Sequence, residues 1–172
     1  MRYGVVFPQT EIGDDPGAVR EYAQAAEALG FHHLIVYVHV LGADPAHHDF
    51  PALRTYNHKS VVHETLTLMG YLSAITERVG LATGILILPQ RQTVLVAKQA
   101  SSLAALSGDR LGLGVGLSPW PEDFTAMGVP WERRGKRMDE CLDIVRGLTE
   151  HGANFLDMPV ARAMSHPLIT CT

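Results

Sequence analysis

The sequence predicts an α/β fold in which buried parallel strands alternate with helices, and three observations carry this prediction. The segment Val79 to Ser118 places the apolar runs LATGILIL and DRLGLGVG on either side of a helical stretch, in the order strand, helix, strand. Both runs are almost continuously apolar, apart from Thr83 and the opening Asp109-Arg110, instead of alternating with polar residues, which is typical of parallel strands covered on both faces. The chain has 172 residues, 47% of them hydrophobic and 19% charged, as in an ordinary globular domain.

The strand and helix pattern occurs about four times along the chain. The expected strands are Tyr3–Phe7, Leu34–Val38, Leu81–Leu88 and Arg110–Val115. The expected helices are Pro16–Leu29, Val62–Arg78, Thr93–Leu106 and Arg134–Thr149. Four βα units make half of a (β/α)8 TIM barrel, a fold that normally needs about 250 residues. We therefore expect a partial TIM barrel.

Local residues mark where these elements begin and end. The first helix is entered through Asp14-Asp15, starts at Pro16 and closes at Gly30. Helical spacing places Leu29 of this helix and Leu106 of the third helix on inner, buried faces. A polar connection from 39 to 60 follows the second strand, and loops of that length are usually functional.

The βα pattern defines one domain over residues 1–150. Residues 151–172 form an irregular tail that contains at most one short strand, Asn154–Met158. A half barrel leaves two open sheet edges and an apolar face. Self-association into a homo-oligomer would cover them, and truncation of a longer gene product is the alternative explanation.

Charge and cysteine content narrow the class of partner. The formal net charge is −4 and there is no basic run, so we expect a small-molecule substrate and neither nucleic acid nor an anionic membrane. Cys141 and Cys171 form no disulfide framework, which fits the cytoplasm. No run of about 18 apolar residues is present and the opening residues read as a strand, so we expect neither a membrane span nor a leader. The histidines, including His47-His48, lack the spacing of a zinc site, so we expect no metal.

Glycines in the last strand point to close packing. Gly112, Gly114 and Gly116 alternate along GLGVGLS and share one face, so a planar ring or another backbone segment can approach. This spacing is not the dinucleotide fingerprint, because SPWPED and not a helix follows it. Arg91, after the third strand, could hold an anionic group, although a loop arginine is more often solvated.

These stretches together resemble a known superfamily. RYGVVFPQ, EALGFHHLIVYVHVLGAD, LSGDRLGLGVG and GVPWERRGKRMDE, in this order over roughly residues 1–150, resemble the bacterial luciferase-like flavin monooxygenases and their deazaflavin-dependent relatives. The loop LGADPAHHDF and the segment TGILILPQRQT look most like the branch of this superfamily that depends on coenzyme F420. The resemblance implies an oxidoreductase that uses coenzyme F420, or alternatively FMN, on an unknown small organic substrate. The alternative is a non-catalytic or truncated flavin-binding protein that has lost activity.

The resemblance also implies site residues at the C-terminal ends of the strands. His39 would be catalytic, because the family places a histidine there and histidine exchanges protons near neutral pH; otherwise it caps backbone groups. Val38 stands where the family commonly has an acidic residue. Phe7 and Gln9 would line the substrate side, although Gln9 could equally bond loop backbone. The residues expected to hold the cofactor are Thr83, Gly84, Ile85, Gly114, Gly116, Ser118 and Trp120.

Within that set, two positions have a specific expectation. Relatives bend the third strand through a non-prolyl cis peptide, which here would be Gly84-Ile85; the alternative is that Gly84 only relieves crowding inside a narrow barrel. Trp120 would stack near the cofactor ring or close the pocket. It could equally be an aromatic residue that anchors its own loop.

Overall fold

The computed structural model describes residues 1–37, 39–47, 56–118 and 120–150. Its strands are β1 (Gly4–Val6), β2 (His33–Val36), β3 (Gly80–Thr83), β4 (Leu86–Ile87), β5 (Leu111–Gly112) and β6 (Val115–Gly116). Its longer helices are α2 (Pro16–Ala28), α3 (Thr65–Ile75), α4 (Thr93–Ser107) and α6 (Arg134–Glu150). The short helices are α1 (Gln9–Ile12), η2 (Leu88–Gln90) and α5 (Pro121–Ala126). The expected strand over Asn154–Met158 lies outside the described residues.

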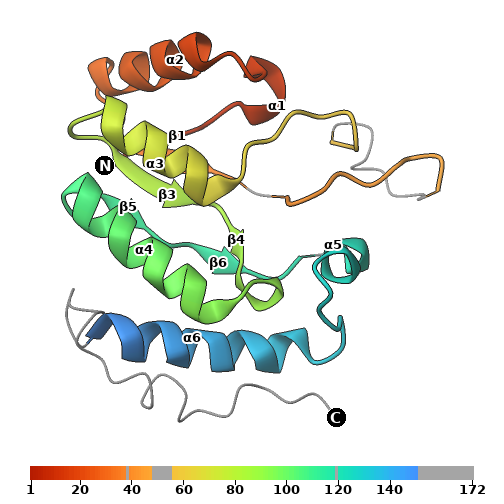
Figure 1. Cartoon of the computed structure of the whole chain (residues 1–172). Coiled ribbons are helices and arrows are strands. Elements are labelled where there is room, and N and C mark those ends of the chain that lie inside the picture. Colours follow the sequence, from red (N-terminus) through yellow and green to blue (C-terminus); the bar gives the residue numbers. More distant parts are fainter. Residues whose placement is uncertain (38, 48–55, 119, 151–172) are drawn as a thin grey trace.

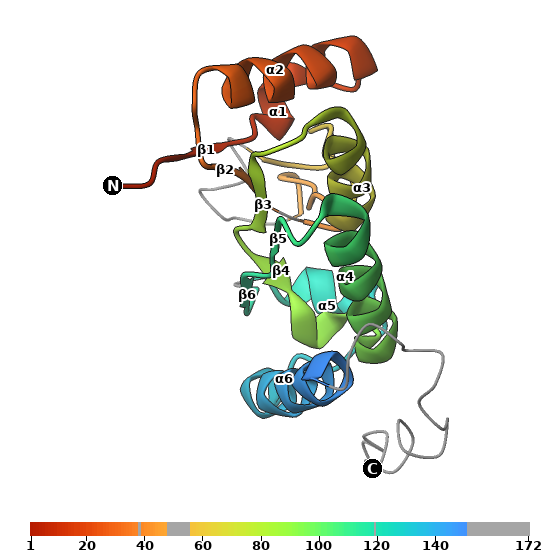
Figure 2. The ribbon, with the colours of Figure 1, turned by 90° about the vertical axis from the view of Figure 1, so that its left-hand side faces the viewer.

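The strands form a parallel sheet in the order of the chain, as the sequence predicts. Strands β1, β2, β3 and β5 pair side by side, and β4 pairs with β6 just beyond them. Helices α2, α3, α4 and α6 follow one another in the same order in Figure 1, and they form an arc around the outside of the strands in Figure 2. The architecture is that of a partial (β/α)8 barrel, in which β1 and β5 are the edge strands of the four-stranded sheet.

The side chains of the sheet divide between two environments. In β2, Leu34 and Val36 are fully buried against the helices, whereas His33 and Ile35 face the inside of the arc and are only partly buried. Small residues continue the inner row, because Ala82 pairs with Ile35 and Gly112 pairs with Ala82. The hydrophobic core therefore lies between the sheet and its helices.

Helix ends follow specific caps. Asp15 accepts hydrogen bonds from the backbone N–H groups of Gly17 and Ala18 and starts α2. Glu64 caps α3, and Thr76 ends it in an extended conformation, so α3 is shorter than the expected Val62–Arg78. A glycine in the left-handed conformation, Gly108 with φ of 65°, ends α4.

Two residues expected on inner helix faces are exposed. Leu29 is 78% exposed and Leu106 is 79% exposed. A step of three residues turns a helix by about 300°, so each third residue drifts off the buried face. After Leu103, the buried position is Ser107, four residues later, rather than Leu106.

The third and fourth expected strands are each interrupted. The peptide bond Gly84-Ile85 is cis, as expected, and it separates β3 from β4. The expected strand Arg110–Val115 is likewise divided into β5 and β6. The chain therefore bends at the same level in two neighbouring strands, directly below the loops that carry the candidate site.

Candidate functional site

The loops after β2 and β6 bring His39 and Asp123 together. Nδ1 of His39 lies 3.2 Å from Oδ2 of Asp123, whose side chain is only 2% exposed. Asp123 lies in the first turn of α5, behind Pro121, where the helix dipole stabilises a carboxylate. Since a carboxylate only accepts hydrogen bonds, Nδ1 carries the hydrogen of this bond, and in the uncharged form of the imidazole the lone pair lies on Nε2.

Ser118 and Trp120 fix the position of Asp123. The hydroxyl of Ser118 donates to Oδ2 of Asp123 at 3.2 Å and accepts from the backbone N–H of Trp120 at 3.0 Å. Both residues are buried, at 2% and 5% exposure. Ser118 thus ties the β6–α5 loop to the carboxylate that orients His39.

Three rings gather around His39. Its imidazole stacks on Trp120 with centroids 4.3 Å apart and on Tyr56 with centroids 4.6 Å apart, and Tyr56 and Trp120 are themselves 5.6 Å apart. Burial raises the pKa of Tyr56, and the negative charge of Asp123 and the nearby Tyr37 raise it further, so the phenol stays protonated. The His39 side chain is 21% exposed, so the cluster is partly open at the imidazole.

The bend in the third strand interlocks with the glycines of the fourth. The carbonyl of Gly114 accepts from Thr83 Oγ1 at 2.6 Å and from the backbone N–H of Leu86 at 2.8 Å. A Cβ on Gly114 would collide with the Thr83 carbonyl oxygen, and one on Gly116 would lie 2.7 Å from Cδ1 of Ile85. At these two positions, therefore, the protein itself fills the space that glycine leaves.

Ile85 is the member of this interlocked group that reaches solvent. Its side chain is 37% exposed, while Thr83 below it is 4% exposed. A Cβ on Gly84 would meet Cγ2 of Ile35 at 2.5 Å, so Gly84 relieves crowding at the same residue pair that is cis. Gly84 therefore has both expected properties, since it precedes the cis peptide bond and also relieves crowding. The bend presents one apolar side chain, Ile85, supported from behind by Gly116.

Phe7 and Gln9 are buried at the end of β1. Phe7 is fully buried and packs edge-on against Tyr22, with centroids 5.4 Å apart, on the α2 side of the sheet. The Nε2 of Gln9 donates to the carbonyl of Tyr37, which is the loop-backbone contact considered as its alternative role. Thr65 donates to the same carbonyl at 3.5 Å. Their assignment to the substrate side stays a prediction.

Two residues of the cluster were not expected from the sequence. Asp123 follows Pro121 in an acidic first helical turn, and this signal could have drawn attention to it. Tyr56 carries no such signal, since only tertiary structure brings the end of a long loop to His39. Val38 lies outside the described residues, so the missing acidic neighbour stays an expectation.

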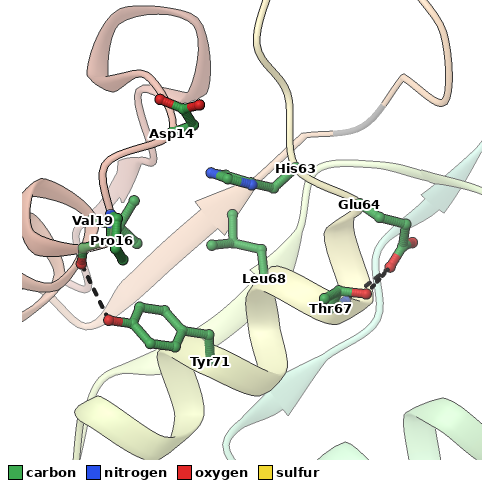
Figure 3. Close-up of a pocket in the computed structure, with 8 residues that line it drawn as sticks. All are labelled: Asp14, Pro16, Val19, His63, Glu64, Thr67, Leu68 and Tyr71. Carbon is green, nitrogen blue, oxygen red and sulfur yellow. Dashed lines mark hydrogen bonds between the residues drawn. The ribbon is translucent and has the colours of Figure 1, made fainter.

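A separate hollow lies between the N-terminal ends of α2 and α3 (Figure 3). Its volume is about 210 Å³, and it is lined by Asp14, Pro16, Val19, His63, Glu64, Thr67, Leu68 and Tyr71. None of the predicted site residues lines it. Throughout the described segments, His, Cys, Asp and Glu side chains do not gather in threes that could hold a metal ion.

Comparison with known proteins gives a family match over most of the chain. The sequence profile described as luciferase-like monooxygenase matches residues 1–167. An uncharacterised protein of Mycobacterium tuberculosis is 52% identical over 109 residues, which are 60% of this chain and 38% of that protein. The chain thus spans well under two thirds of that relative's length. None of the helices in the described residues is long and apolar enough to cross a membrane.

Two solved structures share the fold. The oxygenating constituent of 3,6-diketocamphane monooxygenase from Pseudomonas putida, in complex with FMN, has a TM-score of 0.67 and 16% identity, over 86% of this chain and 39% of that one. The coenzyme F420 dependent tetrahydromethanopterin reductase from Methanopyrus kandleri has a TM-score of 0.63 and 18% identity, over 88% and 41%.

Proposed function

The chain belongs to the luciferase-like monooxygenase family, and on this premise we propose that it works in a flavin- or deazaflavin-dependent oxidoreductase acting on a small organic substrate. The observation that carries the proposal is the hydrogen bond between His39 and the buried Asp123 at the C-terminal ends of the strands. Ligands bind at this end of α/β barrels. The family includes both monooxygenases and reductases, so oxidoreductase is the class of activity that we assign.

In this proposal His39 is the catalytic proton carrier. Asp123 holds Nδ1 through a 3.2 Å hydrogen bond, which leaves Nε2 to take up a proton from a bound group or return it. Trp120 and Tyr56 hold the plane of the imidazole and keep water from most of its surface. Ser118 and Trp120 therefore act through Asp123 and His39, as positioning residues.

Coenzyme F420 and FMN are the cofactors that fit the proposal. Either one, when bound, supplies hydride transfer, and reduced FMN also supplies oxygen activation. The exposed side chain of Ile85, held on the bend at Gly84, offers an apolar surface to a planar ring. Thr83, Gly114 and Gly116 shape that bend from beneath, through the contacts of the Gly114 carbonyl and of Ile85.

A second copy of the chain is the partner that we propose for the open edges. In the described residues, β1 and β5 are edge strands of a parallel sheet, and Val6 beside the inner row is 53% exposed. Two copies related by a two-fold axis along the barrel would place β5 of each beside β1 of the other, with all strands parallel. Sedimentation analysis that finds only monomers at every concentration would rule this out.

The experiment that tests the proposed function is a fluorescence titration of the purified chain with coenzyme F420 and, in parallel, with FMN. Saturable binding of one cofactor and not the other is expected, and it identifies the cofactor for a substrate screen. Absence of binding for both overturns the proposal for this chain. Binding without turnover by any electron donor would favour the non-catalytic alternative.

A further inference from the structure

Arg91 lies where the third βα unit reaches the C-terminal side of the barrel. It follows η2 directly and leads into α4. Its side chain is only 11% exposed, and Nη1 donates to Oε1 of Glu64 at 2.7 Å. The expectation that a loop arginine is solvated is therefore wrong here, and the guanidinium is a mostly buried charge paired with Glu64.

Glu64 is held in place by its other contacts. Its second oxygen, Oε2, accepts from the backbone N–H of Thr67 at 2.8 Å and from Thr67 Oγ1 at 3.0 Å, the two bonds drawn in Figure 3. Burial alone would raise the pKa of Glu64, but the bonds from Thr67 and Arg91 lower it overall. The carboxylate is thus shared between Arg91 and the N-terminus of α3, and it fixes the orientation of the guanidinium.

Among the described residues, the opposite edge of the guanidinium has no acceptor. Nε and Nη2 of Arg91 lie on the same edge of the planar group, and both are buried without a hydrogen-bond partner in the structure as described. The neighbouring Gln90 is 1% exposed, and both of its amide atoms are likewise without partners. Buried polar groups are nearly always paired, and an unpaired charged donor is especially unfavourable. The unpaired donors, Nε and Nη2 of Arg91 and Nε2 of Gln90, therefore call for an acceptor from outside the described residues.

We propose that the Nε/Nη2 edge of Arg91, together with the unpaired side-chain NH2 group of the preceding residue Gln90, binds an oxyanion carried by the substrate or the cofactor. This inference rests on the proposed function. Two parallel N–H donors match the two oxygens of a carboxylate or a phosphate, and this arrangement is the strongest hydrogen-bonded recognition available to arginine. The position, at the end of η2, is on the side of the barrel where ligands bind.

The first experiment measures anion binding alone. Inorganic phosphate and benzoate are titrated into the full chain by calorimetry, for the wild type, Arg91→Lys and Gln90→Leu. Lysine keeps the charge and can still reach Glu64 but has no two-donor edge, so its affinity should fall at least about tenfold. Gln90→Leu leaves Arg91 intact and should weaken binding by about threefold to tenfold. Arg78→Lys, at an arginine that is 71% exposed, is the matched control and should bind as the wild type does.

Two results would overturn the inference. One is equal affinity for both anions in the wild type and Arg91→Lys, and the other is no saturable binding of either anion, which would mean that water alone fills this edge. Circular dichroism of each variant separates loss of the site from loss of the fold. Gln90→Leu is an independent test of the anion site, because it changes neither member of the ion pair between Arg91 and Glu64.

The second experiment identifies which molecule carries the anion. FMN and riboflavin differ by one phosphate, and benzoate and benzyl alcohol differ by one carboxylate. If Arg91→Lys removes the preference for FMN over riboflavin, the oxyanion is the cofactor phosphate. If it removes only the preference for benzoate over benzyl alcohol, the oxyanion belongs to the substrate. Phosphate binding through Arg91 without binding of FMN or F420 would refute the proposed function and support the anion site. Binding of FMN or F420 that Arg91→Lys leaves unchanged, without phosphate or benzoate binding, would refute the anion site and support the proposed function.

Discussion

Asp123 and His39 are 84 positions apart in the chain, yet Oδ2 of one lies 3.2 Å from Nδ1 of the other. Asp123 comes from a short helix after the last described strand, and His39 from the loop after the second. Their contact joins the two loops above the bent strands. The proposed chemistry depends on this pair, and the first two predictions test its members separately.

Replacing His39 by alanine removes the proposed proton carrier. His39→Ala should abolish turnover and leave the affinity for the cofactor within about threefold, since general acid–base groups contribute about 10²- to 10⁴-fold to rate. Stopped-flow assays combined with cofactor titration provide the measurement. Full activity in this variant would remove His39 from the mechanism.

Replacing Asp123 by asparagine tests the orienting role. An amide can donate to Nδ1 and so favours the wrong tautomer of His39, which should lower kcat by about 10- to 100-fold and change its pH profile. Glu122→Gln is the matched control, because Glu122 is the exposed neighbour on the same short helix. A loss of stability with an unchanged pH profile would make Asp123 merely structural.

Glu27 joins α2 to the start of β3 and makes stability depend on pH. Its carboxylate accepts from the backbone N–H groups of Glu77, Arg78 and Val79, at 2.7 to 3.2 Å. Burial would raise the pKa of Glu27, but these bonds lower it below the usual 4.5. The stabilisation is therefore complete above about pH 4.5 and is lost as the pH falls through the lowered pKa.

Glu27→Gln should accordingly destabilise the chain by about 1 to 2 kcal/mol at neutral pH. The difference from the wild type should shrink in acid. Urea denaturation at several pH values measures this, and Glu77→Gln, at a side chain that is 86% exposed, is the control. A difference that is the same at pH 3 and pH 7 would contradict the assigned role.

Arg110 closes the N-terminal end of the sheet with a full set of hydrogen bonds. Its guanidinium makes five contacts of 2.7 to 3.0 Å, to the backbone or side-chain oxygens of Ser73, Thr76, Val79 and Ser107. Arg110→Lys keeps the charge but cannot reach all of these acceptors, and it should lower the free energy of unfolding by about 2 to 3 kcal/mol. Thermal unfolding tests this, with Arg146→Lys on the exposed face of α6 as the control. Equal stability of the two variants would show that the contacts contribute little.

Gly114 and Gly112 offer a matched pair of alanine substitutions. A Cβ at Gly114 runs into the backbone carbonyl of Thr83, whereas one at Gly112 makes only ordinary contacts, the nearest at 3.5 Å from Cβ of Ala82. Gly114→Ala should therefore destabilise the chain by about 2 to 4 kcal/mol, and Gly112→Ala by less than about 1 kcal/mol. Chemical denaturation of both variants makes the comparison. Similar values would mean that the fourth strand simply shifts to admit the methyl group.

The sequence predicts the order of the elements better than the contacts at their ends. Continuous apolar runs and helix caps such as Asp15 and Gly108 are local signals, and they place the four βα units correctly. The exposure of Leu29 and Leu106 depends on the exact helical phase, which spacing by threes does not resolve.

In the candidate site, too, residues can be predicted one by one, but the contacts between distant segments cannot. His39, Gly84 and Ile85 were expected because a family resemblance points to them, and the cis bond between the last two is present. Tyr56 and Asp123 contact His39 only because separate loops pack together. Phe7 lies on the α2 side of the sheet, where its ring packs against Tyr22. Long-range contacts of this kind carry no local pattern in the chain.

The shared carbonyl of Gly114 has a consequence for local opening of the barrel. It accepts from the amide of Leu86 and from the hydroxyl of Thr83 at once, on both sides of the bend. Exposing the Leu86 amide to solvent therefore requires the neighbouring segment to separate as well. Exchange of the Leu86 amide hydrogen for deuterium should therefore occur in one cooperative step that releases both strand ends together. The segments around Thr83, Leu86 and Gly114, which lie beneath the candidate site, would then move as a single unit.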